Sequence, residues 1–557
     1  MTLRLGGASG FGGCGLALLA VLCLPGAVTV ASSGQPGPGL WILVTPFDAS
    51  PALAPLIERR RGEGFSVVVV TNDLPKPGAA SPDDAATLRG RLRNLAGKYD
   101  GPTYVLLAGN ASAAMGNTNA ADLAVQALRG ATGRMKGCPT DFGYALPDPD
   151  GAPAVRVGRF PARTIDELRG MVQKTLLFEQ DEPAPGAWQD RLLLMIGNPG
   201  GGPLAEMFMQ QNFNAHVAAL HPSWQLRTIM NIASSPYYLP RPQDREAALD
   251  YLRGGNLFSV YLGHSGAEGM GLDGRFFVRK DWSEVRIPSG AGPFFTVGCW
   301  ACQSNGKGDG YGLAAMRNPD GPVAVIGASG ESYSAPGQLA VEGLLSQLVQ
   351  PPFSGRLGEY WLAAQAGLAR GHMDPTTFAL LDAADGTGGK VPLATQRLEH
   401  LEMWMLLGDP ALRMPITPMD VSLQPLPPIA AGQLIQVRGT LPARLSGAAV
   451  RVTLERPLNS APAGLERVPP SSLDTAAARE RVFAANHRRA NAFEIAAIEV
   501  TGSGTEFAAS LTVPADLPWK KLVVRAAARV GNQSGLAVTS VPVNVNNDAA
   551  AGEAGSH

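Results

Sequence analysis

A cysteine and a histidine each follow directly on a short apolar segment of this sequence. Cys299 ends segment 293–299, PFFTVGC, and His264 lies in segment 261–266, YLGHSG. Both segments have the pattern of a buried strand that ends in a reactive side chain. Reacting groups of open α/β sheets gather at the carboxyl ends of the strands. A thiol and an imidazole placed there are suited to nucleophilic catalysis, since the imidazole moves a proton and the thiolate attacks a carbonyl carbon.

Glycines flank both candidate catalytic residues. Gly263 and Gly266 allow the backbone to turn sharply and to approach a substrate closely. The amides of Cys299 and of Ser265 or Gly266, just after His264, are candidates for an oxyanion hole. Taken alone, the cysteine has the simpler interpretation of a small buried side chain, and the histidine that of a structural hydrogen-bonding group. Together they predict an enzyme.

Cys302, three residues after Cys299, leaves other chemistries open. The C-x-x-C spacing of the two cysteines is typical of a thiol–disulfide redox centre, and Cys302 is also a rival nucleophile. We favour Cys299 as the nucleophile because it directly ends the strand. Zinc bound by Cys299, Cys302 and His264 needs a fourth ligand that the sequence does not identify.

The surrounding elements alternate between strand and helix. Strands are expected at residues 40–46, 65–70, 104–109, 154–159, 191–196, 226–232, 257–262, 294–297 and 323–327. Helices are expected at residues 52–61, 85–99, 164–179, 204–220, 337–348, 355–370 and 402–407. This order predicts a mostly parallel α/β sheet with helices on both faces. It divides into two blocks, residues 40–180 and 181–416, and the second carries Cys299 and His264.

The pattern changes at about residue 417. Short alternating segments separated by Pro-rich turns predict an immunoglobulin-like, all-β sandwich over residues 417–546. Residues 459–489 are polar and irregular, and we interpret them as a long inserted loop. Residues 547–557 are expected to be a disordered tail.

Length, charge and the amino-terminal residues limit the class of protein. The chain has 557 residues, enough for two or more domains, and a formal net charge of -1 with no basic stripe, which argues against a nucleic-acid partner. Residues 1–31 combine Arg4, a short apolar run and small residues before a cut, so they are interpreted as a signal peptide, with an uncleaved anchor as the alternative. No second long apolar segment follows. We therefore expect a secreted or cell-envelope protein without an integral membrane segment in its mature chain.

Removal of residues 1–31 leaves Cys138, Cys299 and Cys302. An odd number of cysteines in an exported chain leaves at least one free thiol. Three cysteines make a poor disulfide framework and a reasonable supply for catalysis.

Several segments, in family order, resemble the gingipain family of cysteine peptidases, whose fold is shared with caspases, legumain and separase. They are residues 41–46 (WILVTP), 140–145 (TDFGYA), 157–161 (VGRFP), 261–266 (YLGHSG), 294–299 (FFTVGC), 323–329 (VAVIGAS) and 407–412 (LGDPAL). The resemblance implies a caspase-like catalytic region followed by a β-sandwich, and hydrolysis of protein or peptide substrates through a thioester acyl-enzyme. It makes Cys299 the nucleophile and His264 the group that transfers protons.

The resemblance also bears on the pocket and on cofactors. Tyr333 falls where an aromatic residue lines the substrate pocket in relatives, and a core or loop aromatic is the alternative interpretation. The chemistry requires no cofactor, although calcium stabilises members of the family. Asp148 and Asp150 are candidate calcium ligands, and a solvated Pro-Asp turn is their other interpretation.

The sequence departs from the family pattern beside the histidine. The family commonly has His-Gly, whereas this chain has His264-Ser265-Gly266. Some members orient the histidine with an acidic residue where this chain has Ala154. These departures leave open a non-catalytic relative that only binds peptides, because a fold alone does not establish activity.

Overall fold

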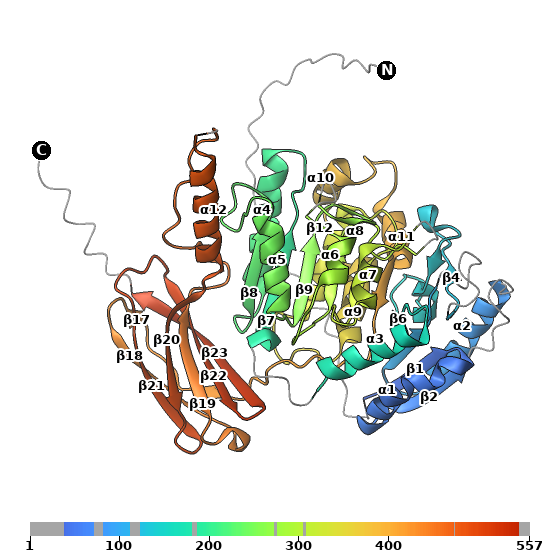
Figure 1. The fold of residues 1–557 in the computed structure, drawn as a ribbon, viewed down its shortest axis with the longest axis horizontal. Helices are drawn as coiled ribbons and strands as arrows, with labels where there is room; N and C mark the ends of the chain where they lie inside the picture. The colour runs from blue at the N-terminus through green and yellow to red at the C-terminus, as the bar shows by residue number, and fades with distance from the viewer. Residues whose placement is uncertain are drawn as a thin grey trace, which may run out of the picture. The chain divides into compact units, whose positions relative to one another are not determined.

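A ten-stranded sheet forms the centre of the α/β region (Figure 1). Its order is β2-β1-β3-β6-β15-β14-β13-β9-β7-β8, and only the β14–β15 pair is antiparallel. The strands are β1 (Leu40–Thr45), β2 (Ser66–Thr71), β3 (Thr103–Ala108), β6 (Arg156–Phe160), β7 (Arg191–Ile196), β8 (Gln225–Met230), β9 (Phe258–Leu262), β13 (Phe294–Val297), β14 (Val325–Ala328) and β15 (Trp404–Leu407).

The computed structural model describes residues 38–71, 82–111, 123–180, 187–271, 276–304, 308–472 and 474–544. The expected signal peptide at residues 1–31 and the expected tail at residues 547–557 lie outside the described residues. Among the described helices, none is long and apolar enough to cross a membrane.

The two halves of the large sheet meet at a narrow seam. The strands β1, β2, β3 and β6 come from residues 40–180, and the other strands come from residues 181–416. One register pair, Leu407 with Arg159, joins β15 to β6. The strands of the two expected α/β blocks therefore occupy opposite halves of one sheet.

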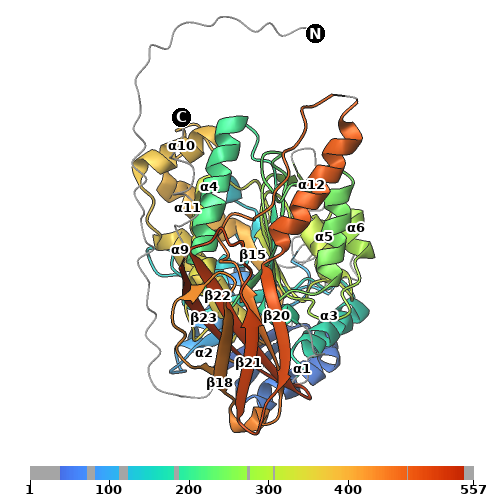
Figure 2. The ribbon, with the colours of Figure 1, turned by 90° about the vertical axis from the view of Figure 1, so that its left-hand side faces the viewer.

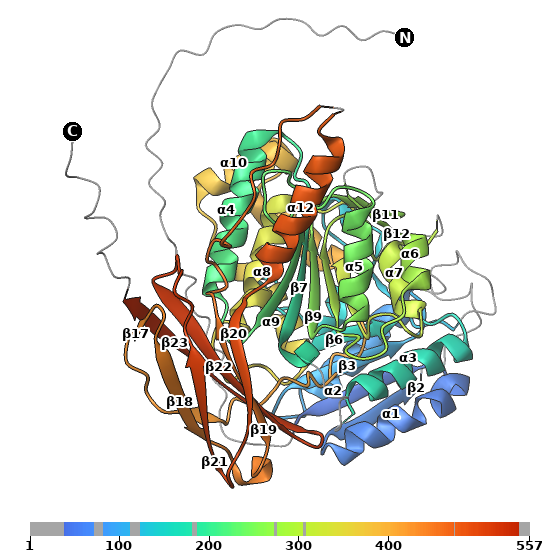
Figure 3. The ribbon, with the colours of Figure 1, turned by 60° about the vertical axis from the view of Figure 1, so that its left-hand side comes forward.

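Helices cover both faces of this sheet (Figure 3). Successive side chains of β1 alternate between two cores, as strand geometry requires. The first core includes residues of α2 (Pro82–Ala96), α4 (Pro203–Ala219), α8 (Ser334–Ser346), α9 (Leu357–Arg370) and α11 (Leu393–Met403). The second includes residues of α1 (Ser50–Gly62), α3 (Ile165–Phe178), α5 (Gln243–Arg253), α6 (Arg279–Glu284) and α7 (Tyr311–Arg317). The prediction of a mostly parallel sheet with helices on both faces is confirmed.

The prediction of a helix at residues 402–407 is wrong. Helix α11 ends at Met403, and the next four residues form strand β15. Periodicity does not separate helix from strand in so short an apolar run. Pairing with β14 decides the outcome, and β15 becomes the strand that joins the two halves of the sheet. The sequence also gave no indication of α10 (Pro375–Asp385).

Two smaller sheets follow the α/β region (Figure 2). The first has the order β16-β18-β21, and the second has the order β17-β23-β22-β19-β20. All their pairs are antiparallel except β17–β23. The bounds are β16 (Ser422–Leu423), β17 (Ile429–Ala430), β18 (Leu434–Thr440), β19 (Ala449–Glu455), β20 (Glu494–Thr501), β21 (Glu506–Thr512), β22 (Lys521–Val530) and β23 (Gln533–Asn544). One hydrophobic core contains residues of both sheets.

The segment interpreted as a long loop contains a helix, α12 (Ala476–Asn491), so that interpretation is wrong. Its buried face includes the polar residues Asn486 and His487, which weakens the apolar periodicity that signals a helix. The side-chain amide of Asn491 pairs with both backbone groups of Thr228 on β8, at 2.7 and 3.0 Å. Since β8 is an edge strand, this contact covers backbone groups that an edge leaves unpaired.

Candidate active site

Strands β9 and β13 bring His264 and Cys299 to the same edge of the sheet. Leu262 and Val297 are the last register pair of these parallel strands, and His264 and Cys299 each stand two residues beyond it. The Gly263 amide donates to the Val297 carbonyl at 3.1 Å, so the two backbone segments stay paired just beyond the end of β9. The equal offset places both residues where a parallel sheet gathers its reacting groups.

The half-buried thiol of Cys299 lies against the backbone of Ser332. Its sulfur is 3.4 Å from the Ser332 amide nitrogen, which donates to it, and 3.5 Å from the Ser332 carbonyl oxygen. Burial raises the pKa of Cys299, the Ser332 amide opposes that rise, and the charges of Asp385 and Glu331 add to it. Cys299 is therefore a protonated thiol at neutral pH.

The imidazole of His264 is held by a backbone carbonyl. Its Nε2 lies 3.0 Å from the Pro199 carbonyl oxygen. A carbonyl oxygen only accepts hydrogen bonds, so Nε2 carries the hydrogen, and Nδ1 of the neutral ring keeps its lone pair. Among the described residues, no hydrogen bond joins this ring to the thiol of Cys299. The imidazole is thus oriented independently of the thiol, with Nδ1 able to accept a proton.

A tight loop between β7 and α4 presents the Pro199 carbonyl. The three glycines that follow, residues 200–202, have φ values of 71°, 71° and 77°, which favour glycine. The Asn198 side chain accepts a hydrogen bond from the Gly200 amide at 2.8 Å and closes the turn. The triple glycine thus serves the turn that presents a carbonyl to His264.

The second cysteine of the C-x-x-C segment faces the core. Cys302 is 1% exposed, and burial raises the pKa of its thiol far above the ordinary value. Cys138, Cys299 and Cys302 are all free thiols. Of the two cysteines in the segment, Cys299 is therefore the accessible one.

Ser265 and Gly266 form the short strand β10 (Ser265–Gly266), which pairs with β11 (Gly269–Met270) in a hairpin. The side chain of Ser265 makes a contact that the sequence did not predict. Its hydroxyl donates to the carbonyl oxygen of Cys299 at 2.8 Å. The Ser265 side chain therefore contacts the backbone of the candidate nucleophile.

Tyr333, the predicted pocket aromatic, follows directly on the Ser332 that contacts Cys299. Its ring packs against charged and polar groups: the Arg134 guanidinium carbon lies 3.9 Å from the ring centroid, and the His400 ring centroid lies at 5.5 Å. The Tyr333 amide donates to Nε2 of His400 at 2.8 Å. Burial lowers the pKa of His400 to about 3, so its ring stays neutral and accepts this bond.

Sequence reasoning missed Pro199, Ser332 and His400. The first two contact the candidate catalytic residues through backbone atoms, which have no side-chain signature. His400 acts one step away, by fixing the backbone next to Ser332. A sequence pattern identifies reactive side chains more readily than the backbone groups that hold them.

The candidate calcium ligands do not fit a calcium ion. One carboxylate oxygen of Asp148 accepts from the amides of Asp150 and Ala152 at 3.0 and 2.9 Å, and the other pairs with Arg370. A guanidinium on the carboxylate opposes a second cation there, and the amide contacts are those of a turn. Within the described ranges, no three His, Cys, Asp or Glu residues are grouped closely enough to hold a metal.

Alkylation of Cys299 is expected to depend steeply on pH. Because burial raises its pKa, the thiolate forms only above the pH at which an ordinary cysteine ionises, about 8.5. Iodoacetamide rates should be measured by mass spectrometry in a Cys138→Ser chain, where Cys302 stays buried. The rate is expected to keep rising above pH 9. A plateau below pH 8 would instead indicate that His264 stabilises the thiolate as an ion pair.

The fold and the site together define a class of protein. A mostly parallel sheet that places a thiol and an imidazole at the ends of neighbouring strands is an arrangement suited to a cysteine hydrolase. The model of Peptidase family C25 matches residues 35–415, and the chain belongs to this family, the gingipain family of cysteine peptidases. No curated protein matches the chain.

Solved structures share the fold. One is the Arg-specific cysteine proteinase gingipain R, at 16% identity and a TM-score of 0.50, with 92% of this chain and 99% of that chain covered. Another is the complex of the RgpB pro- and mature domains of Porphyromonas gingivalis, at 14% identity and a TM-score of 0.50, with 91% and 100% covered. A third, described as a protease, has a TM-score of 0.52 at 14% identity, with 91% and 98% covered.

Proposed function

We propose that this chain is a cysteine endopeptidase in which Cys299 is the nucleophile and His264 transfers protons. The observation that carries the proposal is the equal offset of the two residues from the Leu262–Val297 pair. The accessible thiol of Cys299 and the free Nδ1 of His264 support it. The Pro199 carbonyl accepts a hydrogen bond from the imidazole and orients the ring, as an acidic side chain does in a catalytic triad.

The first half of the reaction forms a thioester. The sulfur of Cys299 attacks the carbonyl carbon of the scissile bond, and its proton passes to Nδ1 of His264. The amides of Cys299 and of Ser265 or Gly266 stabilise the developing oxyanion. The imidazolium then gives its proton to the leaving amine, the C–N bond breaks, and the acyl group remains on sulfur.

The second half hydrolyses the thioester. His264 takes a proton from a water molecule, whose oxygen attacks the acyl carbon, and the C–S bond breaks. The proton returns to the sulfur, and the product acid releases its remaining proton to solvent and leaves as a carboxylate. These steps use a thiol, an imidazole and backbone amides and require no metal ion.

The wider proposal covers the rest of the chain. Residues 1–31 have the pattern of a signal peptide, which supports export to the cell envelope or beyond. The two sheets that share a core after residue 417 support an immunoglobulin-like sandwich. The substrates are proteins or peptides, as for the family.

The proposal is tested by covalent labelling with peptide acyloxymethyl ketones under reducing conditions. Tandem mass spectrometry then locates the modified cysteine, with His264→Ala as the comparison chain. We expect the label on Cys299 in the wild type and a much slower reaction in His264→Ala. A label on Cys302 would contradict the assignment. No label with any probe would favour a peptide-binding protein. In a parallel reaction without reductant, protection of both thiols that ends when reductant is added would favour the redox alternative.

A further inference from the structure

The peptide bond that follows Cys299 is held from two sides. Its carbonyl oxygen accepts from the Ser265 hydroxyl at 2.8 Å, and its nitrogen, that of Trp300, donates to the Gly330 carbonyl at 2.9 Å. Ser265 follows β9, and Gly330 follows β14, the strands on either side of β13. Both neighbours of the central strand thus fix one peptide plane beside the nucleophile.

This peptide plane is in a strained arrangement. Trp300 has a φ of 64°, a left-handed conformation that is unfavourable for a bulky side chain. Such conformations persist only where the surroundings impose them, and they cluster at functional sites. The hydroxyl of Ser265 is one of the two groups that hold this peptide plane, since it bonds the carbonyl side.

A buried hydroxyl chain leads to Ser265. Tyr311 donates to the Ser265 hydroxyl oxygen at 3.4 Å, and Thr296 of β13 lies 2.6 Å from the Tyr311 hydroxyl. Thr296 and Tyr311 are both 0% exposed. Gly298 completes the fit, because a Cβ there would lie 2.4 Å from the Ser265 hydroxyl oxygen. The hydroxyl therefore occupies space that only glycine at position 298 leaves free.

We propose that Ser265 is a positioning residue for the nucleophile, and that its hydroxyl, through the Cys299 carbonyl, sets the direction of the Cys299 thiol. The inference rests on the proposed function and gives a role to the residue inserted between His264 and Gly266. With the peptide fixed, the sulfur stays against the Ser332 amide, at 3.4 Å. Without the hydroxyl, the peptide relaxes toward an ordinary φ at Trp300, and the sulfur leaves that amide.

The test compares Ser265→Ala, Ser265→Thr and Tyr311→Phe with the wild type on a peptide substrate. Loss of the hydroxyl is expected to lower kcat about 10- to 100-fold with little change in KM, as for one lost hydrogen bond to a polar group. Threonine keeps the hydroxyl and is expected to restore most of kcat. Tyr311→Phe, which removes only the more distant donor, is expected to cost less than Ser265→Ala.

A second readout separates positioning from folding. The hydrogen bond from the Ser332 amide lowers the pKa of Cys299. If Ser265→Ala breaks this hydrogen bond, the pH profile of iodoacetamide alkylation is expected to move further to alkaline pH. Thermal unfolding of each variant checks the fold. An unchanged kcat and alkylation profile in Ser265→Ala, or a threonine variant as slow as alanine, would overturn the inference. If the wild type itself neither cleaves nor labels, the proposed function fails instead.

Discussion

Cys299→Ala is expected to lower kcat/KM for peptide hydrolysis by about 10⁴- to 10⁶-fold, to the level of the background reaction. The variant keeps the amides proposed for the oxyanion hole but has no side-chain atom that can form the proposed thioester. The effect is expected in kcat, because the thiol takes part in bond making and contributes little to substrate binding. Activity is measured on the peptide that labels best as a ketone probe.

Cys302→Ala is the matched control for this prediction. The same atoms are removed three residues away, from a side chain that is 1% exposed and packed in the second core. The expected result is activity within about threefold of the wild type and a loss of about 1 kcal/mol in the free energy of unfolding, from the small cavity. An inactive Cys302→Ala chain together with an active Cys299→Ala chain would reverse the assignment of the nucleophile.

The sequence was sufficient to place the thiol and the imidazole, because both follow apolar runs that form adjacent strands. The same two runs, β9 and β13, also fix which edge of the sheet they share. The sequence was insufficient for the Pro199 carbonyl and the Ser332 amide, since any residue type has these groups. The contact from Ser265 to the Cys299 carbonyl was not predicted for another reason. The serine after the histidine was interpreted only as a departure from the His-Gly pattern of the family, and its hydroxyl was given no role.

The motifs that carry the resemblance also include residues with a structural role, outside the candidate active site. Arg159 is 1% exposed and pairs with Asp141 at 2.6 Å, and it also donates to the Gly109 and Val125 carbonyls at 2.7 and 2.8 Å. One guanidinium thereby satisfies a carboxylate and two loop carbonyls, which a neutral side chain does not do. The motif at residues 140–145 thus supplies the carboxylate of a buried ion pair, and the motif at residues 157–161 supplies its guanidinium.

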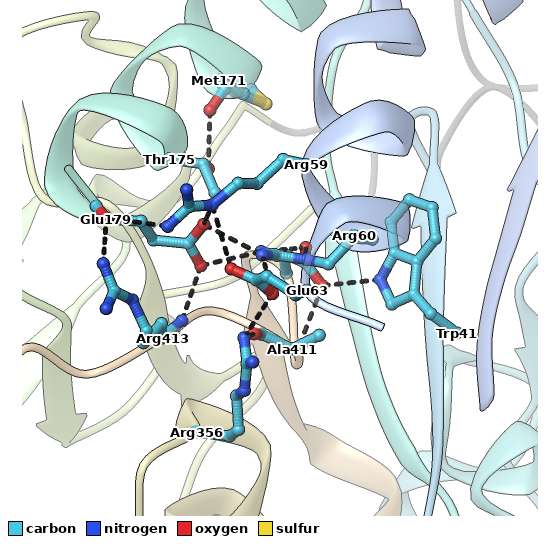
Figure 4. Close-up of polar contacts among 11 residues, drawn as sticks. Trp41, Arg59, Arg60, Glu63, Met171, Thr175, Glu179, Arg356, Ala411 and Arg413 are labelled. Carbon is cyan, nitrogen blue, oxygen red and sulfur yellow. Dashed lines mark hydrogen bonds and ion pairs between the residues drawn. The ribbon is translucent and has the colours of Figure 1, made fainter. Parts of the chain in front are cut away.

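The closing motif belongs to a second buried cluster (Figure 4). Arg60 of α1 is 0% exposed and makes a bidentate pair with Glu179, at 2.8 and 2.9 Å. It also donates to Asp409, which follows β15, at 2.8 and 3.0 Å. Trp41 donates to the other oxygen of Asp409 at 3.1 Å. The cluster ties the first helix to the end of the strand that joins the two halves of the sheet.

The charges of this cluster depend on one another. Burial alone would lower the pKa of Arg60, but the charges of Asp409 and Glu179 outweigh burial and raise it. Burial alone would likewise raise the pKa of Glu63, but Arg60 and Arg356 hold it below the ordinary value. The stability that Glu63 contributes is therefore present above the ordinary carboxyl pKa and is lost as pH falls.

Arg60→Met is expected to lower the free energy of unfolding by about 3–5 kcal/mol, because it leaves two buried carboxylates without their shared cation. Urea unfolding followed by tryptophan fluorescence measures the loss. Arg61→Met is the matched control on the same helix: Arg61 is 55% exposed and pairs with an exposed Glu58, so a change within about 0.5 kcal/mol is expected. Equal effects of the two variants would contradict a structural role for the cluster.

The Arg60→Met penalty is also expected to depend on pH. Burial raises the pKa of Glu179 even beside Arg60, and loss of the guanidinium is expected to raise it further. At neutral pH the folded variant therefore either holds an uncompensated buried carboxylate or takes up a proton, and both add to the loss. As pH falls toward the ordinary carboxyl pKa of about 4.3, the unfolded chain also takes up this proton, so the difference between variant and wild type is expected to shrink. A penalty that stays constant between pH 7 and pH 4 would mean that lost packing, and not uncompensated charge, destabilises the variant. This dependence separates the electrostatic role of Arg60 from the volume that its side chain fills.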